Sequence, residues 1–204
     1  MNKDNFKDFT PSQPTGERMA LPAGLYEAHV IAARVDDPDD KPVLLIQVDI
    51  DNGEYKGFYH KLYDNQKNGQ YPAKYKGVYR AQLPDGRDQE HDAWRQKTLE
   101  GVAWAFEQSN PGYHWDFDES RLKGLKIGLN VREREYYYNK RFGVHTEIGR
   151  LESLAAMNDP DESKRPKVMK KRLLSERERK QKEQDDANAS NNGYVEVDSE
   201  ELPW

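Results

Sequence analysis

The sequence predicts a mainly β domain of five strands, with one helix between the third and fourth strands. Three observations predict this fold class: several short segments alternate apolar and polar residues, turn residues separate them, and one stretch at 92–109 has helical periodicity. The chain of 204 residues is 35% hydrophobic and has a mean hydropathy of −1.14. It therefore has room for one domain of ordinary core size and for additional polar segments.

The first two strands are expected at 25–35 and 43–50, on either side of an acidic turn at 36–40. Asn52-Gly53 is a strong turn signal, and it predicts a hairpin leading to a third strand at 56–63. In that third strand Phe58, His60 and Leu62 alternate with a second set of side chains, which would form an aromatic and basic face. This set is Tyr59, Lys61 and Tyr63.

Residues 64–91 form a long polar insertion, and an insertion of this length in a compact domain is usually functional or mobile. It is rich in basic residues and tyrosines, among them Lys74, Lys76, Arg80, Tyr71, Tyr75 and Tyr79. The segment could fold over a bound ligand. Alternatively, the four-residue spacing of its tyrosines could belong to a short helix that packs its own rings.

The helix expected at 92–109 has one apolar stripe, and it ends before Asn110-Pro111-Gly112. The stripe consists of Leu99, Val102, Ala103 and Phe106. We expect Trp94, Trp104 and Trp115 to pack in or around the core, with Trp94 as the first candidate for an exception.

The last two strands are expected to form a hairpin over 125–151, with a loop at 139–143. Ile127, Leu129 and Val131 would face the core, because side chains in a strand alternate between the two faces. The opposite face would carry Asn130, Arg132, Arg134, Tyr136 and Tyr138. Such a face suits single-stranded nucleic acid, since arginine neutralises phosphate and rings stack on bases. It could also be an ordinary exposed strand whose arginines pair with Glu133 and Glu135.

This order of elements is that of the OB-fold, a small Greek-key barrel that commonly binds oligonucleotides. In such a barrel the third strand, the insertion and the hairpin would face one groove. The predicted nucleic-acid contacts are Tyr59, Lys61, Tyr63, Lys74, Lys76, Arg80, Arg132, Arg134, Tyr136 and Tyr138.

The net charge of −5 is unevenly distributed along the chain. Residues 164–182 contain ten Lys or Arg and two Glu, a net charge of +8, whereas residues 183–204 contain seven acidic residues and no basic ones. We therefore expect four regions. They are a flexible N-terminal arm at 1–20, the domain at 21–157, a basic charged arm or helix at 158–183, and a flexible linker with an acidic tail at 184–204.

The acidic tail resembles the C-terminal tip of bacterial single-stranded DNA-binding proteins, in which acids precede an aliphatic residue, a proline and a terminal aromatic. The residues that carry this resemblance are Asp198, Glu200, Glu201, Leu202, Pro203 and Trp204. The resemblance implies that the tail binds replication or recombination proteins, such as a polymerase, helicase, primase, recombinase or nuclease. Trp in place of Phe and Leu in place of Ile are departures from the usual tip.

The domain also resembles single-stranded DNA-binding proteins of phages and prophages of Gram-positive bacteria. The matching segments are Leu21-Pro22-Ala23-Gly24-Leu25-Tyr26, Gly53-Glu54-Tyr55-Lys56-Gly57-Phe58, Ser109-Asn110-Pro111-Gly112-Tyr113 with Trp115-Asp116-Phe117-Asp118, and residues 122–129. The resemblance implies an OB-fold that coats unpaired DNA in replication and recombination, in the cytoplasm of a bacterial host and associated with its nucleoid. It does not extend to the basic arm.

Enzyme and metal motifs are weak in this sequence. There is no Cys, the five His are far apart, and neither a phosphate-binding Gly-rich loop nor a Gly-x-Ser-x-Gly elbow is found. Acidic clusters at 36–40 and 116–119 could in principle hold Mg²⁺ as in a nuclease, but turns and a helix end are the favoured explanation for them. We therefore expect a non-enzymatic protein without cofactor, metal or membrane association. The alternative is a replication or recombination adaptor whose domain binds a partner protein and which has only weak, non-specific affinity for DNA, supplied by the basic arm. The oligomeric state is left open.

Overall fold

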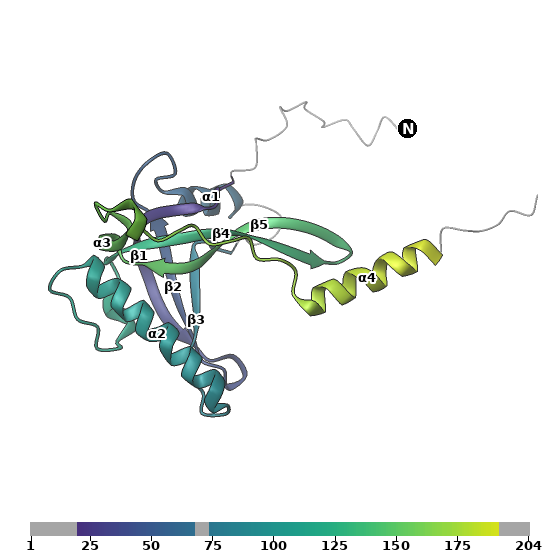
Figure 1. Cartoon of the computed structure of the whole chain (residues 1–204), viewed down its shortest axis with the longest axis horizontal. Helices are drawn as coiled ribbons and strands as arrows, with labels where there is room; N and C mark the ends of the chain where they lie inside the picture. The colour runs from purple at the N-terminus through teal and green to yellow at the C-terminus, as the bar shows by residue number, and fades with distance from the viewer. Residues whose placement is uncertain (1–19, 68–73, 192–204) are drawn as a thin grey trace, which may run out of the picture.

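Five antiparallel strands form one sheet in the order β3-β2-β1-β4-β5 (Figure 1). The structure is a computed structural model, and it describes residues 20–67 and 74–191. The predicted five-stranded antiparallel sheet is confirmed. Among the described residues, no ladder joins β3 to β5, so the sheet is not closed into a barrel.

β1 (Gly24–Asp36) and β2 (Val43–Ile50) confirm the first two predicted strands. A short 3-10 helix at Pro38–Asp40 joins them. β1 is the central strand and pairs with both β2 and β4. Alternate residues of β2 point to the core, so that Ile46 and Val48 are fully buried.

α1 (Phe58–Gln66) replaces the third strand that the sequence predicted at 56–63. The aromatic residues in this segment also fit a helix, because Phe58 and Leu62, and likewise Tyr59 and Tyr63, are four residues apart. Phe58 and Tyr59 are buried on this helical face. The strand prediction was therefore wrong: a period of two was assigned to a pattern that is equally compatible with a period near four.

The start of α1 is fixed by Asp49, a buried side chain on β2. Its carboxylate accepts hydrogen bonds from the backbone N–H groups of Ile50, Tyr59 and His60. Two of these donors belong to the first turn of α1, where N–H groups have no partner within the helix. Asp49 therefore acts as the N-terminal cap of α1 from a neighbouring strand.

β3 (Val78–Gln82) lies within the segment that the sequence treated as an insertion. It pairs with β2 along its whole length, and Tyr79 and Ala81 point to the core. The interpretation of Tyr75 and Tyr79 as one face of a short helix is therefore wrong for Tyr79. Tyr71 lies outside the described residues.

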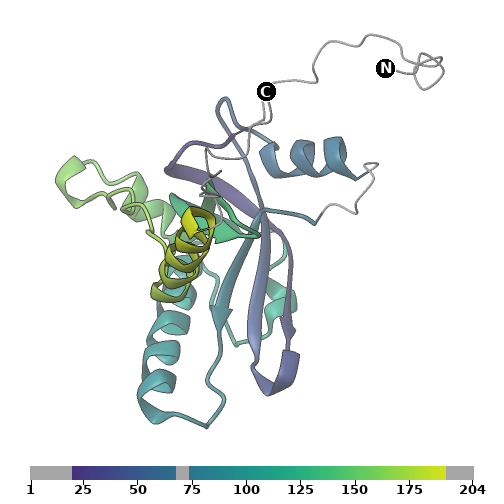
Figure 2. The ribbon, with the colours of Figure 1, turned by 90° about the vertical axis from the view of Figure 1, so that its right-hand side faces the viewer.

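α2 (Gln89–Ser109) confirms the predicted helix and begins three residues earlier than expected. Its apolar stripe, including Val102 and Phe106, is buried. The prediction for the tryptophans is confirmed for Trp115, which is 3% exposed, and wrong for Trp94 and Trp104, which are 62% and 52% exposed on α2. In Figures 1 and 2, α1 lies at one end of the sheet, whereas α2 runs along the other half.

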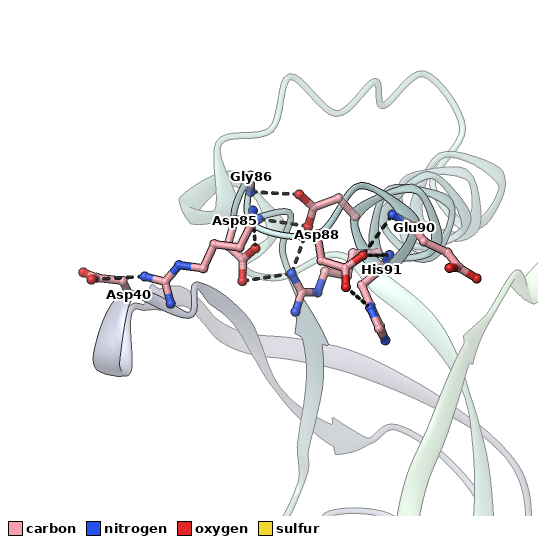
Figure 3. A network of polar contacts seen from close by, with 9 residues as sticks. Asp40, Asp85, Gly86, Asp88, Glu90 and His91 are labelled. Carbon is pink, nitrogen blue, oxygen red and sulfur yellow. Dashed lines mark hydrogen bonds and ion pairs between the residues drawn. The ribbon is translucent and has the colours of Figure 1, made fainter.

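A polar network anchors the first turn of α2 (Figure 3). Asp88 caps the helix by accepting hydrogen bonds from the N–H groups of Glu90 and His91. Arg95 lies 2.9 Å from both Asp85 and Asp92. Arg87 also reaches Asp40 in the turn between β1 and β2, at 3.2 Å, so the network connects α2 with the sheet.

β4 (Lys126–Tyr138) and β5 (Arg141–Glu152) confirm the predicted hairpin. A 3-10 helix at Glu119–Leu122 precedes β4. The turn is shorter than the predicted loop: only Asn139 and Lys140 connect the strands, and both have positive φ, as in a type I′ turn. The hairpin extends beyond the other strands (Figure 1).

The segment after the hairpin contains α3 (Leu154–Met157), a 3-10 helix at Glu162–Lys164 and α4 (Glu176–Asn191). Between the last two, residues 167–174 run along β4, and we call them the strap (Figure 1). The expected basic arm is therefore partly an extended segment on the domain and partly a helix.

Candidate nucleic-acid interface

The outer face of the β4–β5 hairpin combines cationic and aromatic side chains. The register places Arg132 opposite Glu147 and Arg134 opposite His145. Further along the strand, Tyr136 lies opposite Gly143. We call this surface the hairpin face; it consists of Arg132, Arg134, Tyr136, Tyr138, His145 and Glu147.

Two arginines of β4 share one carboxylate on β5. Arg132 lies 2.9 Å and Arg134 3.2 Å from Glu147. A third guanidinium, that of Arg172 in the strap, lies 3.7 Å from the same carboxylate. Burial opposes ionisation of Glu147, but the hydrogen bonds and charges of Arg132 and Arg134 outweigh it and lower the pKa of this carboxyl group. Three positive charges thus surround one negative charge, and the cluster has a net charge of +2.

His145 lies in the same electrostatic environment. Burial lowers the pKa of its imidazole below the ordinary value of 6.5, and the charge of Arg134 lowers it further. Glu147 partly opposes this effect, and Lys76 adds to it. Lys76 lies in the segment just before β3, and residues of β3 contact residues of β5.

The aromatic part of the hairpin face is held in place by a glycine. The ring of Tyr136 lies over Gly143, where a Cβ atom would be 2.5 Å from the ring. The same ring lies 5.2 Å from the imidazole of His145. Gly143, expected to form part of the loop, instead gives space to this ring. Tyr136 is 36% exposed and Tyr138 71% exposed, so both can accept a stacking partner.

Tyr63 lies near the segment that approaches this surface. Its ring is 6.0 Å from that of Tyr75, next to Lys76 in the chain. Tyr75 donates a hydrogen bond from its hydroxyl to the carbonyl oxygen of Val48, which fixes the segment on the sheet. Lys74 and Lys76 are exposed. The structure thus brings the predicted residue Lys76 towards the hairpin, with Tyr63 beside the same segment.

Tyr59 and Lys61 do not take the positions that the strand prediction gave them. Tyr59 is 6% exposed and packs in the core, where burial raises the pKa of its hydroxyl. It is therefore not accessible for stacking on a base. Lys61 is on α1 and donates a hydrogen bond to the carbonyl oxygen of Lys56, 2.8 Å away. Burial therefore excludes Tyr59 from the candidate interface, whereas Lys61 is exposed on α1 and its contact with nucleic acid stays a prediction.

Arg80 is exposed in the middle of β3. It pairs in register with Leu45, which in turn lies opposite Arg34 on β1. The charge of Arg80 also contributes to the lowered pKa of Asp36, after the stronger effect of Arg34. Arg80 is therefore placed beside the acidic turn between β1 and β2.

The acidic clusters considered as Mg²⁺ sites form local contacts. Asp36 pairs with Arg34, Asp40 with Arg87, and Asp116 with Arg121. Within residues 20–67 and 74–191, no group of three or more His, Asp or Glu is arranged to hold a metal ion. The predicted partner-binding residues from Asp198 to Trp204 lie outside the described part of the chain.

Three residues of this site do not follow from the sequence prediction: His145 and Glu147 of the hairpin face, and Arg172, which lies beside it. Glu147 and His145 lie on the strand opposite the arginines, so a register for the hairpin would have found them. Nothing in the sequence placed Arg172 there, because its contact depends on how the strap docks.

Comparisons with known proteins do not assign a family. A scan against protein-family models gives no match, and a search of curated proteins finds no significant relative. In the described part of the chain, no helix is both long and apolar enough to cross a membrane.

Proposed function

We propose that the protein binds single-stranded DNA through the hairpin face, without catalysing a reaction on it, and coats unpaired DNA in phage replication or recombination. The observation that carries this proposal is the cluster of Arg132, Arg134 and Arg172 around one carboxylate, next to the exposed rings of Tyr136 and Tyr138. Guanidinium groups can bind phosphates while rings stack on bases, and neither contact requires a particular sequence.

We also propose that the sheet is an OB-fold opened between β3 and β5. Its strand order, with β1 between β2 and β4 and a helix between β3 and β4, agrees with that fold. Residues of β3 contact residues of β5, so the two edge strands approach each other without pairing. The hairpin would then be the loop between the fourth and fifth strands, one of the loops that bind oligonucleotides in OB-folds.

The direct test is binding of the full chain to fluorescently labelled oligo-dT, measured by anisotropy at two salt concentrations. We expect binding that weakens steeply with salt and that also occurs with mixed-sequence oligonucleotides. Absence of binding at low salt would refute the function. Degradation of the oligonucleotide in the presence of Mg²⁺ would instead support a nuclease.

The acidic tail is proposed to recruit replication or recombination proteins, and to compete weakly with DNA for the basic hairpin face. A chain ending at Asn191 should therefore bind oligo-dT more tightly than the full chain at low salt, and the difference should shrink at high salt. Equal affinities of the two chains under both conditions would exclude this competition.

A pH-dependent probe of the interface is His145. The pKa of His145 is lower in the folded state than in the unfolded state, so protonation of the imidazole lowers the free energy of unfolding. This stability is fully present above pH 6.5 and is lost as the pH falls through the folded-state pKa. A bound phosphate would favour the protonated imidazole and raise this pKa. NMR titration should therefore give a His145 pKa below 6.5 in the free protein and a higher one with oligo-dT. An unchanged pKa in the complex would place the DNA elsewhere.

The alternative function, a replication or recombination adaptor, has its own supporting observation. Trp94 and Trp104 are both more than half exposed on α2, and tryptophan is enriched at protein interfaces. Replacing both by Ala should leave oligo-dT affinity unchanged if DNA binds the hairpin face. A large loss of affinity would instead indicate that α2 takes part in DNA binding.

A further inference from the structure

The strap, residues 167–174, is the least expected part of the interface. It carries four basic residues and no acidic one: Lys167, Lys170, Lys171 and Arg172. The strap could be a cover that DNA displaces, or it could be a fixed part of the binding surface. The contacts with β4 distinguish these two possibilities.

One end of the strap is fixed by Asn130, a fully buried residue on β4. Its amide donates hydrogen bonds to Glu152, at 2.9 Å, and to the carbonyl oxygen of Lys167, at 3.0 Å. Its oxygen accepts a hydrogen bond from the N–H of Met169, at 3.0 Å. Removing the strap would take away the donor to the Asn130 oxygen and one of the two acceptors of its amide nitrogen, and leaving buried polar groups unpaired is unfavourable.

The close approach at this point also depends on Gly149 of β5. A Cβ atom at this position would lie 2.8 Å from the sulfur of Met169 and 3.1 Å from the Cδ of Arg132. Met169 therefore packs over the glycine and beside the stem of Arg132. Gly149 thus lets the strap and the stem of Arg132 approach the same point of β5.

The other end of the strap extends the sheet. The N–H of Arg172 donates to the carbonyl oxygen of Glu133, at 2.8 Å, and the N–H of Glu135 donates to the carbonyl oxygen of Arg172, at 2.9 Å. These bonds pair backbone groups of β4 that β1 leaves without a partner, because β1 pairs with β4 only up to Val131. Lys171 adds an ion pair with Glu135, at 2.9 Å.

We propose that the strap is a fixed wall of the DNA-binding surface and that Arg172 is a third phosphate-binding residue. Its backbone is held in the sheet, while its side chain, 49% exposed, reaches Glu147 beside Arg132 and Arg134. This inference rests on the proposed function, because it assigns a further contact to the same surface. It gives a defined role to part of the basic arm, for which the alternative function offered only non-specific attraction of DNA.

The first test compares Arg172→Ala with Arg87→Ala in the full chain. Arg87 is a suitable control, because its side chain is 51% exposed and also pairs with one carboxylate, that of Asp40. We expect Arg172→Ala to weaken oligo-dT binding by about fivefold. The slope of log association constant against log salt concentration should become shallower by about 0.7, as for one lost phosphate contact. Arg87→Ala should have neither effect.

The second test is hydrogen exchange of the strap with and without oligo-dT. The amides of Met169 and Arg172, which bond to β4, should gain more protection on DNA binding than the amide of Val30. Val30 is buried on the central strand β1 and bonds to the carbonyl oxygen of Leu125, so its amide reports global stability. Loss of protection in the strap would show that DNA displaces it and would overturn the inference. Unchanged affinity of Arg172→Ala would also overturn the inference. In that case, binding of oligo-dT by the wild-type chain would still support the proposed function. If the wild-type chain does not bind oligo-dT, both proposals are refuted.

Discussion

Replacing Arg132 and Arg134 together by Ala is expected to weaken oligo-dT binding by about 10- to 100-fold. Both guanidinium groups lie on the hairpin face, and both are held by Glu147. Their removal leaves this carboxylate with Arg172 alone, so the cluster changes from a net charge of +2 to neutral. The slope of log association constant against log salt concentration should become shallower by about 1.4, because each of two lost phosphate contacts contributes about 0.7. Anisotropy titrations over a series of salt concentrations measure both quantities.

The matched control is the pair Arg34→Ala and Arg121→Ala. These arginines are also paired with one carboxylate each, Asp36 and Asp116, but they lie outside the hairpin face. The control removes the same charge from the protein, so it corrects for any general attraction of DNA. A second version with Gln at positions 132 and 134 keeps much of the stem of Arg132 against Met169. If the folded Ala and Gln variants bind DNA as tightly as the control, the hairpin face is an ordinary exposed strand with paired charges.

The parts of the fold that could be predicted are those whose apolar pattern fits only one period. The apolar residues of β2 and β4 recur at every second position, namely Leu44, Ile46, Val48 and Ile50 in β2 and Ile127, Leu129 and Val131 in β4, and both strands were located correctly. α1 was not, since its aromatic residues fit a strand as well as a helix, and the residue that caps it, Asp49, belongs to another element. β3 was missed because a strand of five residues inside a polar segment gives little periodic signal.

The candidate site shows the same division. Arg132, Arg134, Tyr136 and Tyr138 follow from alternation along one strand, so the sequence alone could place them on one face. Contacts between remote segments could not be derived, and these decide which residues join the site. The burial of Asn130 under the strap is the clearest example: alternation placed it on the exposed face, whereas docking of residues 167–169 buries it fully.

Truncation of a single ring at the tip of the hairpin is the second large effect that we expect. Tyr138→Ala should weaken oligo-dT binding by about 5- to 150-fold, which corresponds to the roughly 1 to 3 kcal/mol of one base stacked on an aromatic ring. The side chain is 71% exposed, so its removal should leave the free energy of unfolding nearly unchanged. Titration with oligo-dT and urea denaturation of the same preparation measure the two quantities.

Two further variants decide whether stacking is the cause. Tyr138→Phe retains the ring and should bind almost as tightly as the wild type, because stacking does not require the hydroxyl. Trp94→Ala removes another exposed aromatic side chain, 62% exposed on α2, and should not change the affinity. Equal losses in Tyr138→Phe and Tyr138→Ala would assign the effect to a hydrogen bond of the hydroxyl, and no loss in either would remove Tyr138 from the interface. Because Tyr138 is neither charged nor buried, a selective loss in the Ala variant can be explained neither by electrostatics nor by unfolding, and it would require direct contact between the hairpin tip and a base.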